Sequence, residues 1–498
     1  MTPSVSVIIA VYNTARYLPE TLASLERQTI GFDRMQVVLV DDGSTDGSER
    51  IIDEFAAKHP ANVVAVHQPN SGTPSVPFNH GLERATGRWV FFLGSDDHLD
   101  DDALQVLVEH GDRWESDVIF GRLEPIGERK VPIAIYREGR VRDMDFYSSR
   151  LPYNLSNTKL FRRSLIEDHG LRYREDMRQR CDQPFTITAL VHARRISMIG
   201  DGAVYFARER ADRSNVTYTA DAAEMYASTE IIMDTIAELL PPGRERDHVM
   251  RRQFDNTIRG DLRDSLSLRE PAEREFVYDR IAELSERYLT EGIERGMKVL
   301  DRAVIRAARD RDTERALALL ALSAGGEHSV GLHVEGERAF FTYPGFDTAG
   351  EHRDTYEITQ EHPLKRIAGL FSPASAAVED DLVVLRGTVS IHGDIEHQGR
   401  LVRAPAGPSR AVRSSEAPQR GRRVDAQIDA GSYRVAIDVR SLSNRVFLPS
   451  IALRVNGEWY DVPLRFEGGS RPLRPGLLRR RLGVARADEA GHLVLDLS

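Results

Sequence analysis

Cysteine is almost absent: the 498-residue chain contains one, Cys181. A single thiol excludes an internal disulfide scaffold and a cysteine-rich zinc site, and it suits a reducing compartment. The first residues lead directly into a predicted strand, without the basic and apolar segments of a secretion signal. We therefore expect a cytoplasmic location, and we interpret Cys181 as a packed thiol because nothing around it indicates activation.

Long apolar runs and a basic excess are also missing. The longest helical apolar run, residues 316–321, falls far short of the roughly 20 residues of a membrane span. The membrane role that the sequence still permits is peripheral association at the inner face. The net charge of −10 argues against nucleic-acid binding, since a phosphate-binding surface needs a basic excess.

Glycine-rich phosphate loops are missing too. Neither Gly-x-x-x-x-Gly-Lys-Ser/Thr nor Gly-x-Gly-x-x-Gly follows the first predicted strand, which weakens an ATPase or a dinucleotide-binding interpretation. If a diphosphate binds here, a metal ion rather than a glycine cradle must meet its charge. The composition, 41% hydrophobic and 29% charged, is that of an ordinary globular protein. The length predicts about three domains.

Strands and helices alternate through the first hundred residues. Apolar, β-branched runs predict strands at residues 5–11, 37–40, 63–66 and 89–93. Helical spacing of apolar residues fills the segments between them. This alternation predicts an α/β domain with a parallel sheet and right-handed crossovers.

Polar residues gather where three of these strands end. Asn13 follows the first strand, Asp41 and Asp42 end the second, and Asp96 and Asp97 follow the fourth. Because parallel strands end at the same edge of a sheet, these residues are expected to converge on one site. Two adjacent acids at the end of a buried strand predict a divalent cation or a bound hydroxyl as partner.

Two of these acidic segments also have a purely structural interpretation. Residues 42–47 would suit a turn that caps the next helix. The acids at 100–102 suit a solvated helix start, favoured by the helix dipole. For Asp96, at the end of a buried strand, we favour a functional role.

Three ordered segments, residues 5–13, 40–47 and 93–97, resemble family 2 glycosyltransferases of the GT-A fold. The resemblance implies a Rossmann-like nucleotide-sugar-binding domain, with Asp42 on the uracil or ribose and Asp96 as the ligand of Mn²⁺ or Mg²⁺. This chain departs from the family pattern at Gly94, where the first acid of D-x-D would stand, and at Phe78, where a basic residue is often found. The residues that the resemblance implies for nucleotide-sugar binding are Val11, Tyr12, Asn13, Asp41, Asp42, Asn70, Asn79, Ser95, Asp96 and Asp97.

The resemblance also implies a direct displacement that inverts the anomeric carbon. A cation stabilises the departing nucleoside diphosphate, and a carboxylate accepts the proton of the attacking hydroxyl. Family 2 enzymes tend to place that carboxylate in an acid-Asp-x-x-Phe setting. Asp182 with Phe185 fits this pattern, although Cys181 replaces the preceding acid, and Asp176 is the alternative base.

The rest of the chain predicts two further domains. We place the GT-A domain at residues 1–219, a helical linker domain at 220–326, and a β-rich domain at 327–498. Short alternating runs in the last domain predict an immunoglobulin-like β-sandwich. This order of domains resembles the wall teichoic acid glycosyltransferases that modify poly(polyol phosphate). The resemblance implies a homo-oligomer, often a trimer in that group, assembled through the C-terminal modules.

Arginines cluster in two C-terminal stretches of this acidic chain. Such runs are commonly solvated loops, but they would also suit a polyanionic or glycan acceptor or an anionic membrane surface. The first stretch has Arg400, Arg403, Arg410, Arg413, Arg420, Arg422 and Arg423, and the second has Arg471, Arg474, Arg479, Arg480 and Arg481.

The sequence therefore predicts a metal-dependent inverting glycosyltransferase that moves a sugar from a UDP-sugar to a cell-envelope glycopolymer such as wall teichoic acid. Exopolysaccharide or capsule synthesis is the alternative acceptor class. A nucleotidyl or polyol-phosphate transferase on a similar sheet is a second enzyme class. A degenerate sugar-nucleotide- or glycan-binding scaffold is the non-enzymatic alternative, and the missing acid at Gly94 favours it.

Overall fold

The computed structural model describes residues 2–129, 131–210, 221–325, 331–359, 371–372, 374–379, 382–393, 395–403, 412–414, 422–429, 431–438, 446–455, 458–465, 471–473, 483–487 and 493–496. The chain folds into two compact units. The first contains residues 1–257 and 283–293, and the second contains residues 258–282 and 294–498. The domain boundaries placed after residues 219 and 326 stay predictions.

A mixed sheet organises the first unit, with strand order β3-β2-β1-β4-β8-β6-β9-β5 and β7 paired to β9. The predicted parallel arrangement is confirmed for β3, β2, β1 and β4, whereas β8 runs antiparallel to both β4 and β6. The strands are β1 (Val5–Val11), β2 (Met35–Asp41), β3 (Val63–His67), β4 (Trp89–Phe92), β5 (His98–Leu99), β6 (Val118–Ile126), β7 (Arg140–Val141), β8 (Leu160–Arg162) and β9 (Ile196–Arg208).

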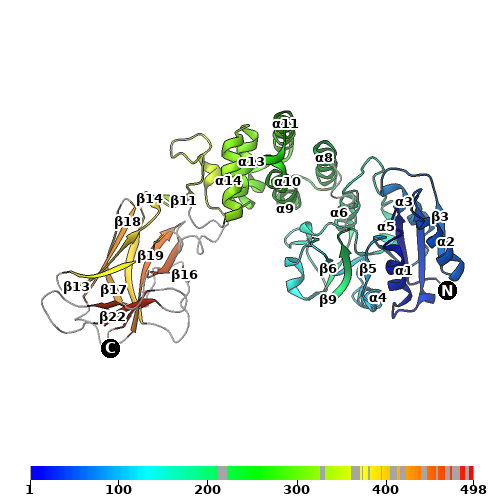
Figure 1. Cartoon of the computed structure of the whole chain (residues 1–498), viewed down its shortest axis with the longest axis horizontal. Helices are drawn as coiled ribbons and strands as arrows, with labels where there is room; N and C mark the ends of the chain where they lie inside the picture. The colour runs from blue at the N-terminus through cyan, green and yellow to red at the C-terminus, as the bar shows by residue number, and fades with distance from the viewer. Residues whose placement is uncertain are drawn as a thin grey trace. The chain divides into compact units, whose positions relative to one another are not determined.

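Helices cover the sheet, as Figure 1 shows in the blue and cyan part of the chain. The inner strand β1 is buried along nearly its whole length, which explains why its sequence is apolar apart from Ser6. Helix α3 packs on β1 and β2, and helix α4 packs on β6 and β9. The helices are α1 (Leu18–Glu26), α2 (Ser48–Lys58), α3 (Ser75–Arg84), α4 (Ala103–Arg113), α5 (Arg163–Asp168) and α6 (Asp182–His192).

The strand register places the predicted polar residues together. Val11 of β1 lies opposite Asp41 of β2, and Ile8 lies opposite Phe92 of β4. Because the three strands run in one direction, the segments that follow them leave the sheet at the same edge. The loops that carry Asn13, Asp42 and Asp96 therefore begin side by side.

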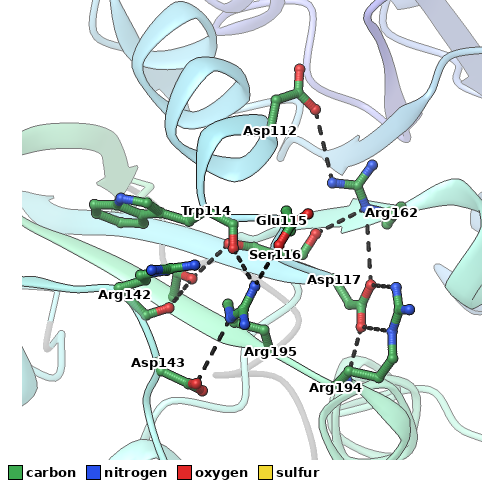
Figure 2. Close-up of polar contacts among 11 residues, drawn as sticks. Asp112, Trp114, Glu115, Ser116, Asp117, Arg142, Asp143, Arg162, Arg194 and Arg195 are labelled. Carbon is green, nitrogen blue, oxygen red and sulfur yellow. Dashed lines mark hydrogen bonds and ion pairs between the residues drawn. The ribbon is translucent and has the colours of Figure 1, made fainter.

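The opposite edge of the sheet carries a network of ion pairs and hydrogen bonds around Asp117 (Figure 2). The buried carboxylate of Asp117 accepts a hydrogen bond from the backbone N–H of Arg194 at 2.8 Å. The guanidinium of Arg194 donates two more, from Nη2 at 2.9 Å and from Nε at 3.0 Å. Burial opposes ionisation, but these hydrogen bonds outweigh it and hold the pKa of Asp117 below its usual value. The interaction joins the start of β6 to the turn before β9.

Arg162 and Arg195 extend this network (Figure 2). The Arg162 guanidinium lies 4.2 Å from the centre of the Trp89 ring, and its Nε donates to the carbonyl of Ser116 at 2.9 Å. Arg195 donates to the carbonyl of Trp114 at 2.6 Å. These contacts tie the starts of β4, β6 and β9 to the end of α4, so the network braces the fold at the edge away from the polar loops.

The chain beyond β9 is helical and then rich in strands, as the sequence predicts. The helices are α8 (Ala222–Leu239), α9 (Arg244–Arg252), α10 (Arg259–Ser265), α11 (Pro271–Tyr288), α12 (Glu291–Gly296), α13 (Val299–Arg309) and α14 (Thr313–Gly325), with a π-helical turn at Gln253–Ile258. No helix among the residues that the structure describes is both long enough and apolar enough to cross a membrane.

The described strands of the second unit form two sheets (yellow to red in Figure 1). The first sheet has the order β11-β10-β14, and the second has the order β12-β13-β18-β17-β15-β19-β23-β22-β21, with β20 paired to β19 and β16. Strands β19 and β20 pair antiparallel, and residues 456–457 between them lie outside the described residues. The strands are β10 (Leu332–Glu335), β11 (Arg338–Phe341), β12 (Ser375–Glu379), β13 (Leu382–Thr388), β14 (Ile391–Gly393), β15 (His397–Arg403), β16 (Val412–Ser414), β17 (Arg422–Asp429), β18 (Ser432–Ile437), β19 (Val446–Val455), β20 (Glu458–Pro463), β21 (Arg471–Leu473), β22 (Gly483–Ala487) and β23 (Leu493–Asp496).

The arginine stretches are described only in part. Arg400 is buried within β15, so it is not a solvated loop residue, whereas Arg422 and Arg423 of β17 are exposed. The remaining members that lie outside the described residues are Arg410, Arg420, Arg474, Arg479, Arg480 and Arg481. The immunoglobulin-like sandwich stays a prediction.

Replacing Asp117 by alanine should lower the free energy of unfolding by roughly 1–3 kcal/mol, because the change leaves the Arg194 backbone N–H without its acceptor. Urea denaturation at pH 7 measures this loss. Arg194→Ala is the matched control and should lose less, since that side chain is 83% exposed. An Asp117→Ala protein as stable as wild type would contradict the bracing role.

The same carboxylate predicts how stability changes with pH. Since folding lowers the pKa of Asp117, its stabilisation is present above the unfolded pKa of about 3.9 and is lost as the pH falls through the lower folded value. Acidification from pH 5 to pH 3 should therefore destabilise wild type more than Asp117→Ala, as measured by thermal unfolding.

Candidate functional site

A cavity of about 450 Å³ opens at the edge of the sheet where β1, β2 and β4 end. Its walls combine apolar side chains with acids and two arginines that come from distant parts of the chain. The residues that line it are Ala10, Val11, Tyr12, Asp42, Asn70, Gly72, Thr73, Pro74, Pro77, Phe78, Gly94, Ser95, Asp96, Arg178 and Arg210. Six residues of the predicted site are among them, namely Val11, Tyr12, Asp42, Asn70, Ser95 and Asp96.

Asp42 is held rigidly in the cavity wall. Its carboxylate accepts hydrogen bonds from Gln68 Nε2 at 2.6 Å, from the Ser71 backbone N–H at 3.0 Å and from Ser71 Oγ at 2.9 Å. The other end of the Gln68 amide is fixed by His80 Nδ1 at 2.5 Å. A carboxylate offers about four lone-pair directions, so one further N–H or O–H donor can bind here.

The predicted residues Asn13 and Asp41 support the cavity and are not among the residues that line it. Asn13 has a positive φ of 50° and accepts a hydrogen bond from the Thr45 backbone N–H at 2.8 Å. Asp41 accepts from the Ser44 backbone N–H at 3.2 Å. The Asn13 bond joins the loop after β1 to the loop after β2, and the Asp41 bond closes the turn after β2. Tyr12 lies in the loop after β1 with 48% of its surface exposed.

The structural interpretation of residues 42–47 holds for Asp46. Its carboxylate accepts from the backbone N–H groups of Ala15 at 2.8 Å and Ser48 at 3.0 Å, at the start of α2. The segment 42–47 therefore contains one acid that lines the cavity, Asp42, and one that stabilises a turn, Asp46.

Asp96 and Asp97 are adjacent but have different surroundings. Asp96 lines the cavity, and its Oδ2 lies 2.6 Å from Arg210 Nε. Asp97 turns away from the cavity, where its carboxylate accepts from Tyr205 OH at 2.5 Å and from the Arg208 backbone N–H at 2.7 Å. Burial and the neighbouring charge of Asp96 raise the pKa of Asp97 to about 6, against the opposing effect of Arg129. Asp97 thus connects the segment after β4 to the end of β9.

The geometry of Asp97 explains why the first position of D-x-D is Gly94. A Cβ atom on Gly94 would lie 2.5 Å from Asp97 Oδ2 and 3.2 Å from Tyr205 OH. Both distances are shorter than ordinary van der Waals contact, so no side chain fits there while Asp97 holds its place. The departure from the family pattern is therefore a matter of packing.

The residues of the cavity fit a divalent cation that also binds a ligand's phosphates. Asp96 offers a hard carboxylate oxygen of the kind that Mg²⁺ and Mn²⁺ prefer. Within the part of the chain that the structure describes, no group of three His, Cys, Asp or Glu side chains forms a complete metal site. Mg²⁺ is commonly held by one or two carboxylates together with substrate phosphates and water, which is the set that Asp96 and a bound diphosphate would supply.

Two arginines that line the cavity were not predicted from the sequence. Arg178 lies before α6 and Arg210 lies just after β9, and neither belongs to a local motif. The segment from 173 to 175 is braced by the predicted residue Asn79, whose amide bonds the backbone of Tyr173 at 2.8 and 2.9 Å. Asn79 therefore supports the wall, and Phe78 lines it without contributing charge.

The predicted base Asp182 is the first residue of α6 and is not among the residues that line the cavity. Burial raises the pKa of its carboxyl, while the positive charges of Arg252 and Lys159 oppose this rise. The alternative base Asp176 is exposed and paired with Arg174 at 2.6 Å. Of these two carboxyl groups, Asp182 is the one whose pKa burial raises, and its role as the base stays a prediction.

Residues 6–170 match the glycosyl transferase family 2, and residues 222–320 match the glycosyl transferase TarS linker domain. Residues 6–170 form a family 2 glycosyltransferase domain. The resemblance predicted from the three motifs is confirmed, as is the order of an α/β domain, a helical segment and a strand-rich region.

The relatives of this glycosyltransferase domain include enzymes named for poly(ribitol-phosphate). The poly(ribitol-phosphate) β-N-acetylglucosaminyltransferase TarS of Staphylococcus aureus is 34% identical over 205 residues, which cover 41% of this chain and 35% of TarS. The poly(ribitol-phosphate) β-glucosyltransferase of Bacillus spizizenii is 30% identical over 233 residues, which cover 47% of this chain and 36% of that enzyme. The matched segment thus spans about a third of these relatives.

Solved structures show the same fold over a longer range. The crystal structure of S. aureus TarS superposes with a TM-score of 0.62 at 19% identity, covering 99% of this chain and 85% of TarS. A TarS fragment in complex with UDP-GlcNAc superposes with a TM-score of 0.59 at 24% identity, covering 68% of this chain and 97% of the fragment.

Restoring the family motif should damage this domain. Gly94→Asp forces a side chain against the Asp97 carboxylate, so it should lower the thermal unfolding midpoint and weaken UDP binding. Gly94→Asp combined with Asp97→Gly vacates that space, so the double variant should recover part of both losses. Calorimetric titration with UDP and thermal unfolding give the two measurements. A stable, tightly binding Gly94→Asp single variant would contradict the packing explanation.

Proposed function

We propose that this chain transfers a sugar from a UDP-sugar to a hydroxyl of a teichoic-acid-type poly(polyol phosphate), with inversion at the anomeric carbon. The observation that carries the proposal is the convergence of Asp42, Asp96 and Arg210 on one cavity at the ends of β2, β4 and β9. Relatives that are named for poly(ribitol-phosphate) transfer, and the TarS fragment in complex with UDP-GlcNAc, support the choice of donor and acceptor.

The nucleoside end of the donor is assigned to the wall that contains Asp42. An ionised carboxylate can only accept hydrogen bonds, and one acceptor direction of Asp42 is not used by Gln68 or Ser71. The N3–H of uracil or a ribose hydroxyl supplies the matching donor. Tyr12, which is half exposed at the same wall, offers a face on which the base can stack.

The diphosphate end is assigned to Asp96, Arg178 and Arg210, which line the same cavity. Mn²⁺ or Mg²⁺ held by Asp96 would act as a Lewis acid on the diphosphate leaving group. Arg210 now pairs with Asp96 at 2.6 Å, and an arginine so placed can also bind phosphate oxygens. These charges would take the place of a glycine-rich phosphate loop. They would also compensate for Phe78, which occupies a position where the family often has a basic residue.

Asp182 is assigned as the general base. It would accept the proton of the acceptor hydroxyl while that oxygen attacks the anomeric carbon from the face opposite the diphosphate. Burial raises the pKa of Asp182, which makes the ionised form a stronger proton acceptor. A single displacement of this kind inverts the configuration of the sugar.

The other candidate functions receive less support. The scaffold hypothesis rested on the missing acid at Gly94, and the position of Asp97 explains that absence by packing. A match to the glycosyl transferase family over residues 6–170 disfavours a nucleotidyl or polyol-phosphate transferase. We further propose homo-oligomerisation through the strand-rich region, action in the cytoplasm and at the inner membrane face, and contact of the exposed Arg422 and Arg423 with a polyanionic acceptor.

Asp182→Asn should slow sugar transfer strongly while UDP binding stays at the wild-type level, since Asp182 does not line the donor cavity. Loss of a general base costs roughly 10²–10⁴-fold in rate. Transfer of radiolabelled N-acetylglucosamine from UDP-GlcNAc to poly(ribitol phosphate) measures the rate, and calorimetry measures UDP affinity. Asp176→Asn is the control and should transfer near the wild-type rate. Near-wild-type transfer by Asp182→Asn would overturn the assignment.

UDP affinity should rise when Mn²⁺ is added, because the cation relieves repulsion between Asp96 and the diphosphate. In Asp96→Asn most of this gain should disappear, a loss of roughly tenfold in affinity, or ~1.4 kcal/mol. Calorimetric titration with and without Mn²⁺ gives both values. Asp102→Asn, at an exposed acid before α4, is the control and should keep the full gain. An Asp96→Asn protein with the wild-type Mn²⁺ effect would exclude Asp96 as a metal ligand.

A further inference from the structure

The surroundings of Asp182 include a residue from the segment matched as the TarS linker domain. Arg252 is the last residue of α9 and lies within residues 222–320, the range of that match. Its Nη1 donates to Gln183 Oε1 at 2.8 Å and to Gln253 Oε1 at 3.3 Å. Gln183 follows Asp182 in the first turn of α6 and is buried. The guanidinium is therefore bonded to the residue next to the proposed base.

Arg252 influences Asp182 without occupying its oxygens. Among the residues that the structure describes, no side chain forms a hydrogen bond or ion pair with the Asp182 carboxylate. The positive charge of Arg252 still opposes the rise in the pKa of Asp182 that burial causes. A direct salt bridge would block the lone pair that must accept a proton, whereas a nearby charge favours the ionised carboxylate and leaves that lone pair available.

Other charged and polar groups also face Asp182. Lys159, just before β8, is fully buried, and Arg180 lies two residues before Asp182. Burial lowers the pKa of Lys159 to about 7, against the effect of Asp182, so this ammonium loses its charge near neutral pH. Burial lowers the pKa of Arg252 only to about 10. Tyr173 and Cys181 are the uncharged titratable neighbours.

The burial of Arg252 is not explained by stability alone. Its Nε is buried and has no acceptor among the described residues. An unsatisfied donor of a charged group costs free energy of folding. A hydrophobic side chain of similar length would avoid this cost, so the guanidinium at this position points to a role for its charge.

We propose that Arg252 is a positioning residue for the general base: through Gln183 it orients the first turn of α6, and through its charge it keeps Asp182 ionised. The inference rests on the proposed function, in which Asp182 accepts the proton of the acceptor. It makes helix α9 part of the active site, although α9 lies outside the matched glycosyltransferase family range.

The test is the pH dependence of kcat/KM for sugar transfer by the full chain. Arg252→Met removes the charge, so the acid limb should move up by about one pH unit, a roughly tenfold lower rate on that limb. The KM for the UDP-sugar should change less than about twofold, since Arg252 does not line the donor cavity. Arg252→Lys keeps the charge and should restore the wild-type limb. Gln183→Met should lower kcat without moving the limb.

Arg244→Met is the matched control, because it removes an exposed arginine from the same helix. Its pH profile should equal that of wild type. UDP affinity and thermal unfolding establish that each variant is folded. If Arg252→Met does not fold, Arg252→Gln takes its place, since it keeps a donor for Gln183 but not the charge, and the same upward shift is expected.

The inference is overturned if the uncharged Arg252 variants have the same acid limb in their pH profiles as wild type and Arg244→Met. This outcome is distinct from failure of the proposed function. That function fails if wild type transfers no sugar from any UDP-sugar or if Asp182→Asn is fully active, whereas Arg252 is judged within an active enzyme.

Discussion

The buried carboxylate of Asp97 is the interaction on which the candidate site depends. It accepts hydrogen bonds from Tyr205 OH and from the backbone N–H of Arg208, so it fixes the end of β9 against the segment that follows β4. This contact joins residues more than a hundred positions apart in the chain. It places Arg210 beside Asp96, and the Asp97 carboxylate occupies the space that a side chain at Gly94 would need. An acid that sequence motifs associate with ligand binding thus serves here to assemble the site.

The carboxylates in and around the site differ in the donors and charges that surround each of them. Asp42 is held by three neutral donors and presents its remaining acceptor direction to the cavity. Asp96 forms an ion pair with an arginine, and Asp46 accepts backbone hydrogen bonds in a turn. Asp182 has positively charged side chains near it that do not form a salt bridge with it. Under the proposed assignment, the same functional group would provide recognition, charge balance, local structure and proton acceptance, depending on which donors reach it. Sequence position alone does not distinguish these roles.

Much of the first unit follows from local patterns. The apolar runs predict β1 to β4 and their parallel order, because buried strands between amphipathic helices allow few other arrangements. Asp42 and Asp96 follow from their positions at strand ends. The antiparallel strand β8, which lies between β4 and β6, could not be predicted, since it depends on pairing between distant segments. Arg178 and Arg210 were missed for the same reason. Four residues predicted to bind the nucleotide sugar are not among those that line the cavity, namely Asn13, Asp41, Asn79 and Asp97.

The compact unit that contains the candidate site does not end where the family match ends. It continues through α8 and α9 to residue 257, and side chains from these helices bond the segment around Asp182, as Glu224 does with Arg178 and Arg252 does with Gln183. Recombination between related enzymes is consequently constrained. An exchange of the N-terminal domain at the edge of the family match would separate side chains that bond to one another. A crossover beyond α9 would transfer these bonded side chains together.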